Sequence, residues 1–217
     1  MKEYLPVIVT LLTVISNSLG GNIKEISAKY IKSNSITPAP FTFSIWGLIY
    51  SLLLYATFIY HKEIFNGNIF SLFIISAILS ATWIQVWGKN LVLSSVILLL
   101  LAASLIMITY ELNKNNVNKI LLYTFGIYTT WAIIASIINL STTLIENDII
   151  DNKSMKTIIL IILSILPFVF NKFFNKTILA MLLTIIWASF GIIMKDTTNN
   201  LIFIIPILIS LIFSFII

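Results

Sequence analysis

Aromatic and polar side chains recur at helical spacing in three hydrophobic stretches of the chain. The aligned sets are Phe43, Trp46 and Tyr50, then Ser80, Trp83 and Trp87, then Tyr128, Trp131, Ala135 and Asn139. Residues spaced by three, seven or eleven positions share one face of a helix, so each set forms one stripe. Stripes of this kind can present flat stacking surfaces and a few hydrogen-bonding groups to a common neighbour.

The depth of Trp131 indicates what its stripe faces. Trp131 lies eleven positions past Ile120, where its hydrophobic span begins, which is about 16 Å along a helix axis. In a bilayer that depth is near the middle of a hydrocarbon core about 30 Å thick. The indole N–H needs an acceptor there, so we expect it to face protein or a cavity. Asn139 lies on the same stripe, and hydrogen bonding between helices is an alternative to a cavity for its amide. An aromatic belt at headgroup depth is the alternative for four other rings, those of Trp46, Trp87, Tyr60 and Tyr110.

The elements that must position these stripes are membrane helices. The sequence is 59% hydrophobic and 10% charged, with a mean hydropathy of +1.04, which is outside the range of soluble domains. Uncharged spans of this length predict an all-α integral membrane protein with seven or eight transmembrane helices. The eight spans are Tyr4–Leu19, Phe41–Tyr60, Ile69–Trp87, Leu91–Tyr110, Ile120–Ile145, Thr157–Phe170, Ile178–Met194 and Leu201–Ile217.

Two spans and one connection allow more than one interpretation. We interpret the first span as a retained helix, with a secretory signal as the alternative. The sixth is short and contains Pro167, so a tilted helix, a kinked helix and a re-entrant segment all fit it. In the connection Gly20–Pro40, Ile23, Ile26 and Tyr30 recur at helical spacing. This pattern predicts a short amphipathic surface helix, acting either as a lid over the bundle or as a plain connector.

The charged residues exclude several classes of function. The net charge of +5 comes from lysines spread over the loops, which leaves no nucleic-acid footprint and no clear membrane orientation. No acid, lysine or histidine lies inside a span, so neither an ion-coupled relay nor a catalytic dyad is expected there. The chain has no cysteine. His61, beside Lys62 at a helix end, is interpreted as an interfacial residue rather than a haem ligand, and no metal site is expected.

Three motifs in order resemble one known family. They are "TPAPFTFSIWGLIY", with Pro38, Trp46, Gly47 and Tyr50; "LSATW", with Leu79, Ser80 and Trp83; and "IYTTWAIIASIIN", with Tyr128, Trp131, Ala135 and Asn139. At these intervals they are similar to the second, third and fifth helices of the tryptophan-rich sensory protein and translocator protein (TspO/MBR) family, also called the peripheral-type benzodiazepine receptor family. Ser80 replaces the usual asparagine and Ile127 the usual proline. The second tryptophan expected near Pro40 and the cholesterol-recognition tail are missing.

The resemblance implies a five-helix bundle around a pocket that binds planar apolar molecules such as porphyrins. It covers residues 1–146, which we expect to form a TspO-like five-helix unit, and leaves 147–217 as a C-terminal extension of about three helices, as in a longer branch of the family. The implied ligand-binding residues are Pro38, Phe43, Trp46, Tyr50, Ser80, Trp83, Tyr128, Trp131, Ala135 and Asn139. The resemblance also allows light-dependent porphyrin breakdown, although the sequence contains no catalytic residue that we could name.

We therefore predict a multi-pass binding or sensory protein of the bacterial cytoplasmic membrane. Its expected partners are the lipid bilayer, a planar apolar small molecule of the porphyrin or haem type and, as an option, a second copy in a homodimer. A facilitative transporter of a neutral or planar solute and a structural subunit without a ligand are the alternatives. In the structural alternative the rings only pack helix against helix.

Overall fold

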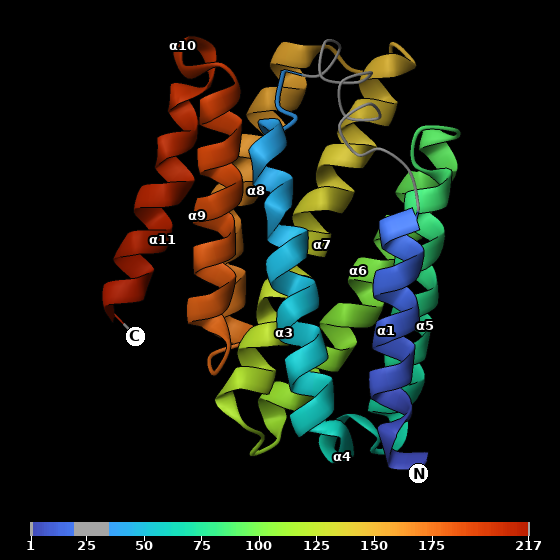
Figure 1. Ribbon diagram of the computed structural model, residues 1–217. Coiled ribbons are helices and arrows are strands. Elements are labelled where there is room, and N and C mark those ends of the chain that lie inside the picture. The colour runs from blue at the N-terminus through green and yellow to red at the C-terminus, as the bar shows by residue number, and fades with distance from the viewer. Residues whose placement is uncertain (1, 20–34, 217) are drawn as a thin grey trace.

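The protein is a bundle of long helices. The computed structural model describes residues 2–19 and 35–216, in which every regular element is helical. The long helices run antiparallel along a common direction (Figure 1). They are α1 (Leu5–Leu19), α3 (Ile45–Ile59), α5 (Gly67–Val86), α6 (Leu91–Lys114), α7 (Lys119–Glu146), α8 (Asn152–Phe173), α9 (Ile178–Lys195) and α11 (Ile204–Ile216). Short helical turns lie at η1 (Lys2–Tyr4), η2 (Pro40–Ser44), α4 (His61–Ile64), α10 (Thr197–Asn200) and η3 (Leu201–Phe203).

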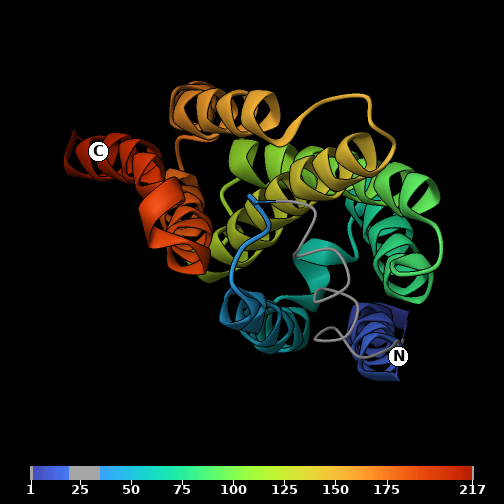
Figure 2. The ribbon, with the colours of Figure 1, turned by 90° about the horizontal axis from the view of Figure 1, so that it is seen from above.

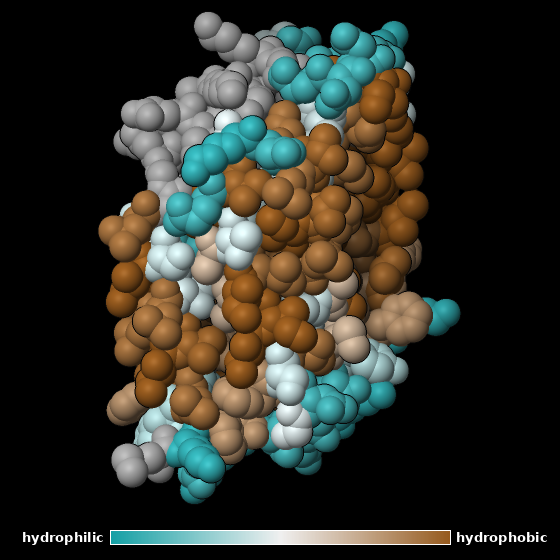
Figure 3. Space-filling view, turned by 90° about the vertical axis from the view of Figure 1, so that its right-hand side faces the viewer, coloured by the Kyte–Doolittle hydropathy of each residue, from teal (hydrophilic) through white to brown (hydrophobic). Residues whose placement is uncertain are grey.

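The hydropathy of these helices confirms the predicted class. Seven of the described helical segments are long and apolar enough to cross a membrane, and α1, at 15 residues, is shorter. Figure 3 shows a hydrophobic belt on one face with hydrophilic side chains above and below it. The chain is therefore a multi-pass, all-α integral membrane protein with seven or eight membrane helices.

Polar residues at the loop ends begin the longest helices. The side chain of Asn90 accepts a hydrogen bond from the Leu93 backbone N–H at the start of α6. Asn118 does the same for Ile120 at the start of α7, and Asp151 caps α8. Such caps satisfy backbone donors that have no partner within the helix. They fix where each membrane helix begins.

Five helices form a closed ring. Around the ring the order is α1, α5, α6, α7 and α3, and each helix contacts the next, including α3 with α1. Figure 2 shows this ring from one end, with α7 crossing near the middle of the molecule. The helices α8, α9 and α11 lie outside it, where α9 packs on α7 and α11 packs on α9 and α8. The inner faces of α3, α5 and α7, which carry the aromatic stripes, therefore meet inside the ring.

The helix bounds decide one open sequence interpretation, that of the sixth span, whereas the predicted surface helix stays untested. The sixth span, expected at residues 157–170, is a continuous helix of 22 residues with Pro167 inside it and buried, so the re-entrant alternative is wrong. The span was underestimated because α8 begins with polar residues after its Asp151 cap. The surface helix expected within Gly20–Pro40 falls mainly on residues 20–34, which lie outside the described residues; residues 35–39, which are described, are not helical.

Candidate ligand pocket

Tryptophans from three ring helices converge at one level of the bundle. Trp46 lies in the first turn of α3, Trp83 in the last turn of α5, and Trp131 near the middle of α7. Their side chains are only 5%, 4% and 2% exposed. Because α3 runs antiparallel to α5 and α7, the start of α3 lies beside the end of α5 at this level. The belt alternative is therefore wrong for Trp46.

The rings contact one another closely. Trp46 stacks on Trp83 with centroids 5.7 Å apart, and its ring stands nearly perpendicular to Trp131, 6.3 Å away. The Phe43 ring lies between two other indoles, with ring centroids 6.1 Å from Trp131 and 6.0 Å from Trp87. Stacked and edge-to-face pairs at these separations are favourable beyond the area that they bury. The cluster therefore has its own packing energy without any ligand.

A small cavity lies against this cluster. Its volume is about 40 Å³, which is enough for one or two water molecules. Seven of the ten residues predicted from the sequence line it, namely Pro38, Phe43, Trp46, Trp83, Trp131, Ala135 and Asn139; the others are Thr37, Trp87, Leu98, Ile134, Ile138 and Thr142. The walls thus come from α3, α6 and α7, from α5 and the residue after it, and from η2 and the chain just before it.

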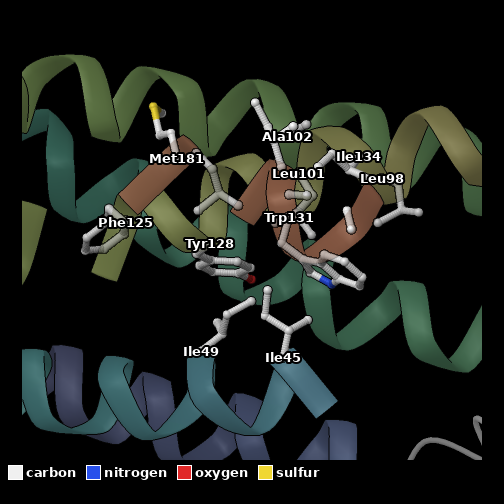
Figure 4. Packing of buried hydrophobic residues seen from close by; sticks show 14 of the residues in the cluster. Ile45, Ile49, Leu98, Leu101, Ala102, Phe125, Tyr128, Trp131, Ile134 and Met181 are labelled. Atoms are coloured by element: carbon white, nitrogen blue, oxygen red, sulfur yellow. The ribbon is translucent and has the colours of Figure 1, made fainter. Parts of the chain in front are cut away.

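The remaining three predicted residues lie beside this cavity rather than on it. Tyr50 stacks on Trp46 at 5.6 Å, and Tyr128 meets the same indole edge-on at 6.1 Å. The amide nitrogen of Asn17 donates to the Tyr50 hydroxyl at 2.6 Å and to the Ser80 hydroxyl at 3.1 Å. Ser80 therefore ties α1 to α5, and the three residues form a polar layer next to the rings. Figure 4 shows Tyr128 and Trp131 extending from α7 toward α3.

Asn139 has its partners within the bundle. Its amide nitrogen donates to Ser94 at 2.7 Å and to Ser95 at 3.1 Å, both on α6. The Ser95 hydroxyl continues the chain of hydrogen bonds to Thr143 at 2.9 Å. The helix-to-helix account of Asn139 is therefore correct for its nitrogen. Asn139 also lines the cavity.

Trp87 was missed as a pocket residue. It is 8% exposed and stacks on Trp83 with centroids 5.1 Å apart, so it is not at the lipid interface. Its spacing of four positions from Trp83 was a signal for the same face of α5. Leu98, Ile134 and Ile138 carried no such signal, because apolar residues occur on every face of these helices.

Three indole N–H groups of the cluster have no hydrogen-bond partner among the described residues. They belong to Trp46, Trp83 and Trp131, and the Thr37 hydroxyl on the same cavity is also unpartnered. By contrast, Trp187 on α9 donates to the Thr42 carbonyl at 2.9 Å. A buried donor without a partner costs about 1–3 kcal/mol, so most native structures avoid it. A molecule that offers hydrogen-bond acceptors would relieve that cost.

The comparison with protein families finds a match over nearly the whole chain. A model described as TSPO-like protein matches residues 4–217. The chain belongs to this TSPO-like family. The match extends through α8, α9 and α11, beyond the three motifs that carried the resemblance. Comparison with curated proteins and with solved structures finds no match.

The cavity of this TSPO-like protein presents flat indole faces, and N–H groups of the same rings have no acceptor among the described residues. None of the described residues that line the cavity carries an imidazole, thiol or thioether that could bind iron. His61 lies on α4, where it stacks on Tyr4 at 4.4 Å and approaches Glu3 at 3.9 Å. Within residues 2–19 and 35–216, no group of acids and histidines could hold a metal ion.

Proposed function

We propose that this TSPO-like protein binds planar, largely apolar molecules with hydrogen-bond acceptors, such as porphyrins, in its intramembrane aromatic pocket. The observation that carries the proposal is that three tryptophans lining one cavity have buried indole N–H groups with no partner among the described residues. A regulatory or sensory role in the bacterial cytoplasmic membrane is part of the same proposal. So is the assignment of the ten predicted residues to this site.

The unpartnered donors favour a ligand over a core that only packs. Indoles that serve as apolar filler can be replaced by phenylalanine, which has no N–H to bury. Trp46, Trp83 and Trp131 instead hold three donors in one place, each costing about 1–3 kcal/mol when unpaired. Carboxylate or carbonyl oxygens on a flat ligand would accept from them. The hydrogen bonds to a carboxylate would be charge-assisted and therefore stronger than those to a neutral carbonyl.

Binding requires the cavity to open. A volume of about 40 Å³ is far below the roughly 300–1,000 Å³ typical of small-molecule sites. A planar molecule inserted between two rings needs about 7 Å between their planes, twice the usual contact distance of about 3.5 Å. Trp46 and Trp83 have centroids only 5.7 Å apart. We therefore expect α3 to shift away from α5 when a ligand enters.

The alternatives make different use of the same rings. In a structural subunit the stacked cluster would only join α3, α5 and α7, and the N–H groups would stay unpaired. A facilitative transporter would need the pocket to open toward both membrane faces in turn. The unpartnered donors favour binding because they gain acceptors only when a ligand arrives.

A titration tests the proposal. Protein purified in detergent is titrated with protoporphyrin, and binding is followed by the visible absorbance of the porphyrin and by quenching of tryptophan fluorescence. We expect saturable binding that is weakened by Trp131→Phe and unchanged by Tyr55→Phe. Tyr55 is the matched control because it lies on α3 but is 49% exposed. No saturable binding, or equal binding by both variants, would contradict the proposal, and counterflow in proteoliposomes would favour the transporter.

A further inference from the structure

The C-terminal helices contact the part of the chain that leads into the pocket. Residues Ser35–Thr42, here called the proline segment, contribute Thr37 and Pro38 to the cavity wall. Of the segment, residues 35–39 are not helical. Irregular backbone is tolerated at membrane depth only when protein covers it and satisfies its polar groups. The groups that hydrogen-bond to the backbone of this segment therefore hold this part of the cavity wall in place.

Helix α9 supplies two of the partners. The Ala39 N–H donates to the Gly191 carbonyl at 2.9 Å. Because Pro38 and Pro40 have no N–H, Ala39 is the only backbone donor in that tripeptide. Three residues further on, the indole of Trp187 donates to the Thr42 carbonyl at 2.9 Å. Both ends of the turn into α3 are thus bonded to one face of α9.

The start of the segment is bonded to α10 and α8. The amide nitrogen of Asn200, which is fully buried, donates to the Ser35 carbonyl at 3.0 Å. It also donates to the Ile192 carbonyl at 2.9 Å, which fixes its own position against α9. The Ser35 N–H donates to the side chain of Asn152 at 3.0 Å. Three C-terminal helices therefore hold a stretch more than a hundred positions away in sequence.

Gly191 shows how close this contact is. A Cβ atom built there would lie 2.1 Å from the Thr42 hydroxyl oxygen and 2.6 and 2.9 Å from its Cγ2 and Cβ atoms. Real Cβ atoms do not approach so closely, so any other residue would push the proline segment or α9 away. Gly191 is thus required by the close approach of the Thr42 side chain rather than by helix formation, which glycine disfavours.

We infer that Trp187, Gly191 and Asn200 are positioning residues that hold the proline segment against the pocket, so that the C-terminal helices set its ligand affinity. The inference rests on the proposed function for its ligand and gives residues 147–217 a role. The division into units at 1–146 and 147–217 stays a prediction. The sequence resemblance ended at residue 146 and assigned no function to residues 147–217.

Hydrogen exchange and a binding titration test the inference together. We compare the full chain with Gly191→Ala and Asn200→Ala, measuring amide exchange in peptides that cover Ile36–Phe43 and the dissociation constant for protoporphyrin. We expect faster exchange in that peptide and weaker binding by about fivefold or more, the effect of losing one hydrogen bond of about 1 kcal/mol. Gly126→Ala is the matched control, because a Cβ there meets its nearest neighbours at an ordinary 3.4 Å.

A double substitution separates positioning from general damage. Gly191→Ala with Thr42→Gly removes the side chain that the new Cβ would strike, so exchange and affinity should return toward those of the wild type. Unchanged exchange in Gly191→Ala and Asn200→Ala would overturn the inference, as would equal effects of Gly126→Ala. If the wild type binds no protoporphyrin, the proposed function fails, and the exchange measurement still decides whether the C-terminal helices hold the segment.

A second, independent feature is an apolar groove on the lipid side of α6, α7 and α8. Its volume is about 400 Å³, within the range of ligand sites, and the described residues that line it present no polar surface to it. Phe170 and Phe174 form its buried floor, while Tyr110 and Phe173 are 40% and 48% exposed at its edge. The full lining is Ile106, Tyr110, Ile133, Leu166, Val169, Phe170, Phe173 and Phe174.

Lysines gather at one end of this groove. The Lys114 ammonium lies 4.0 Å above the Tyr110 ring, and that of Lys172 lies 5.4 Å from the Phe173 ring. Lys176 is nearby, where its ammonium donates to the Asn115 carbonyl at 3.3 Å. Among the described residues, the one acid that forms an ion pair with these lysines is Glu111, which is exposed and lies 3.9 Å from Lys114. An apolar groove with cations at its headgroup end complements an anionic phospholipid.

We propose that the groove holds an acyl chain of an anionic phospholipid whose phosphate lies near Lys114 and Lys172. The test is native mass spectrometry of protein exchanged into mixed phosphatidylglycerol and phosphatidylcholine. We expect retained phosphatidylglycerol, lost in Lys114→Gln/Lys172→Gln and kept in Lys62→Gln/Lys89→Gln, which changes two distant lysines. Equal retention of both lipids, or equal loss in the two double variants, would overturn this proposal.

Discussion

Replacing tryptophan by phenylalanine should destabilise the protein more at Trp187 than at Trp131, although Trp131 is the more buried residue. Trp131 is 2% exposed and its N–H has no partner among the described residues. Trp187 is half-buried and donates to the Thr42 carbonyl. A simple burial argument predicts that the change at Trp131 is the more damaging. The hydrogen-bond accounting predicts the reverse.

The magnitudes follow from the two environments. Trp131→Phe loses about two buried carbons, worth roughly 1.6 kcal/mol, but removes an unpaired donor that costs about 1–3 kcal/mol. The net change is therefore near zero. Trp187→Phe loses about half that apolar burial, roughly 0.8 kcal/mol, and a hydrogen bond of about 0.5–1.5 kcal/mol, which leaves Trp187→Phe about 1–2 kcal/mol less stable.

Thermal unfolding of the ligand-free protein in detergent measures the difference. For a chain of this size, 1 kcal/mol corresponds to a midpoint shift of about 2–4 °C, so Trp187→Phe should lower the midpoint by roughly 2–8 °C. Trp131→Phe should stay within about 2 °C of the wild type, and Tyr55→Phe on the exposed side of α3 is the control. The reasoning is refuted if Trp131→Phe unfolds at a clearly lower temperature than Trp187→Phe.

Three further predictions concern the site and the helix ends. Haem added in place of protoporphyrin should give no spectrum of histidine- or methionine-ligated iron, and such a spectrum would contradict the lining described above. Asn139→Ala removes two interhelical hydrogen bonds, to Ser94 and Ser95, and should destabilise the protein by about 1 kcal/mol, at about 0.6 kcal/mol each, as seen in the thermal midpoint. Hydrogen bonds from Ser154 and from Asn199 lower the pKa values of Asp151 and Asp196. Because these pKa values are lower in the folded protein, the unfolded chain takes up the protons at a higher pH. The stabilisation from the two carboxylates is therefore present above about pH 4 and is lost as the pH falls below it. A midpoint that rises between pH 4 and pH 3 would contradict this.

The membrane class and much of the pocket could be predicted from the sequence because both depend on periodicity. Uncharged spans fix where helices can cross lipid, and stripes at helical spacing place Trp46, Trp83 and Trp131 on single faces. Helices that pack as neighbours must bury such faces against each other. The structure brings those three rings together, which the spacing alone could indicate but not establish.

What the sequence could not provide were contacts between distant segments. The amide of Asn17 reaches Tyr50 and Ser80, and nothing in the first span marks it as their partner. Nothing in the sequence around Gly191 indicates its close approach to Thr42. The ring order of the helices decides these contacts, and a chain with apolar residues on every helix face leaves that order open. Trp87 differs, since its spacing from Trp83 could have placed it in the pocket.

We propose that a ligand supplies acceptors to the three indole N–H groups that have none among the described residues, and indole ¹⁵N NMR tests this most directly. The chain has five tryptophans, so the labelled protein should give five indole signals, assigned through single phenylalanine variants. On adding protoporphyrin, the account predicts downfield shifts for Trp46, Trp83 and Trp131 and little change for Trp187, whose donor already has a partner. Bound porphyrin that leaves those three signals in place would contradict it.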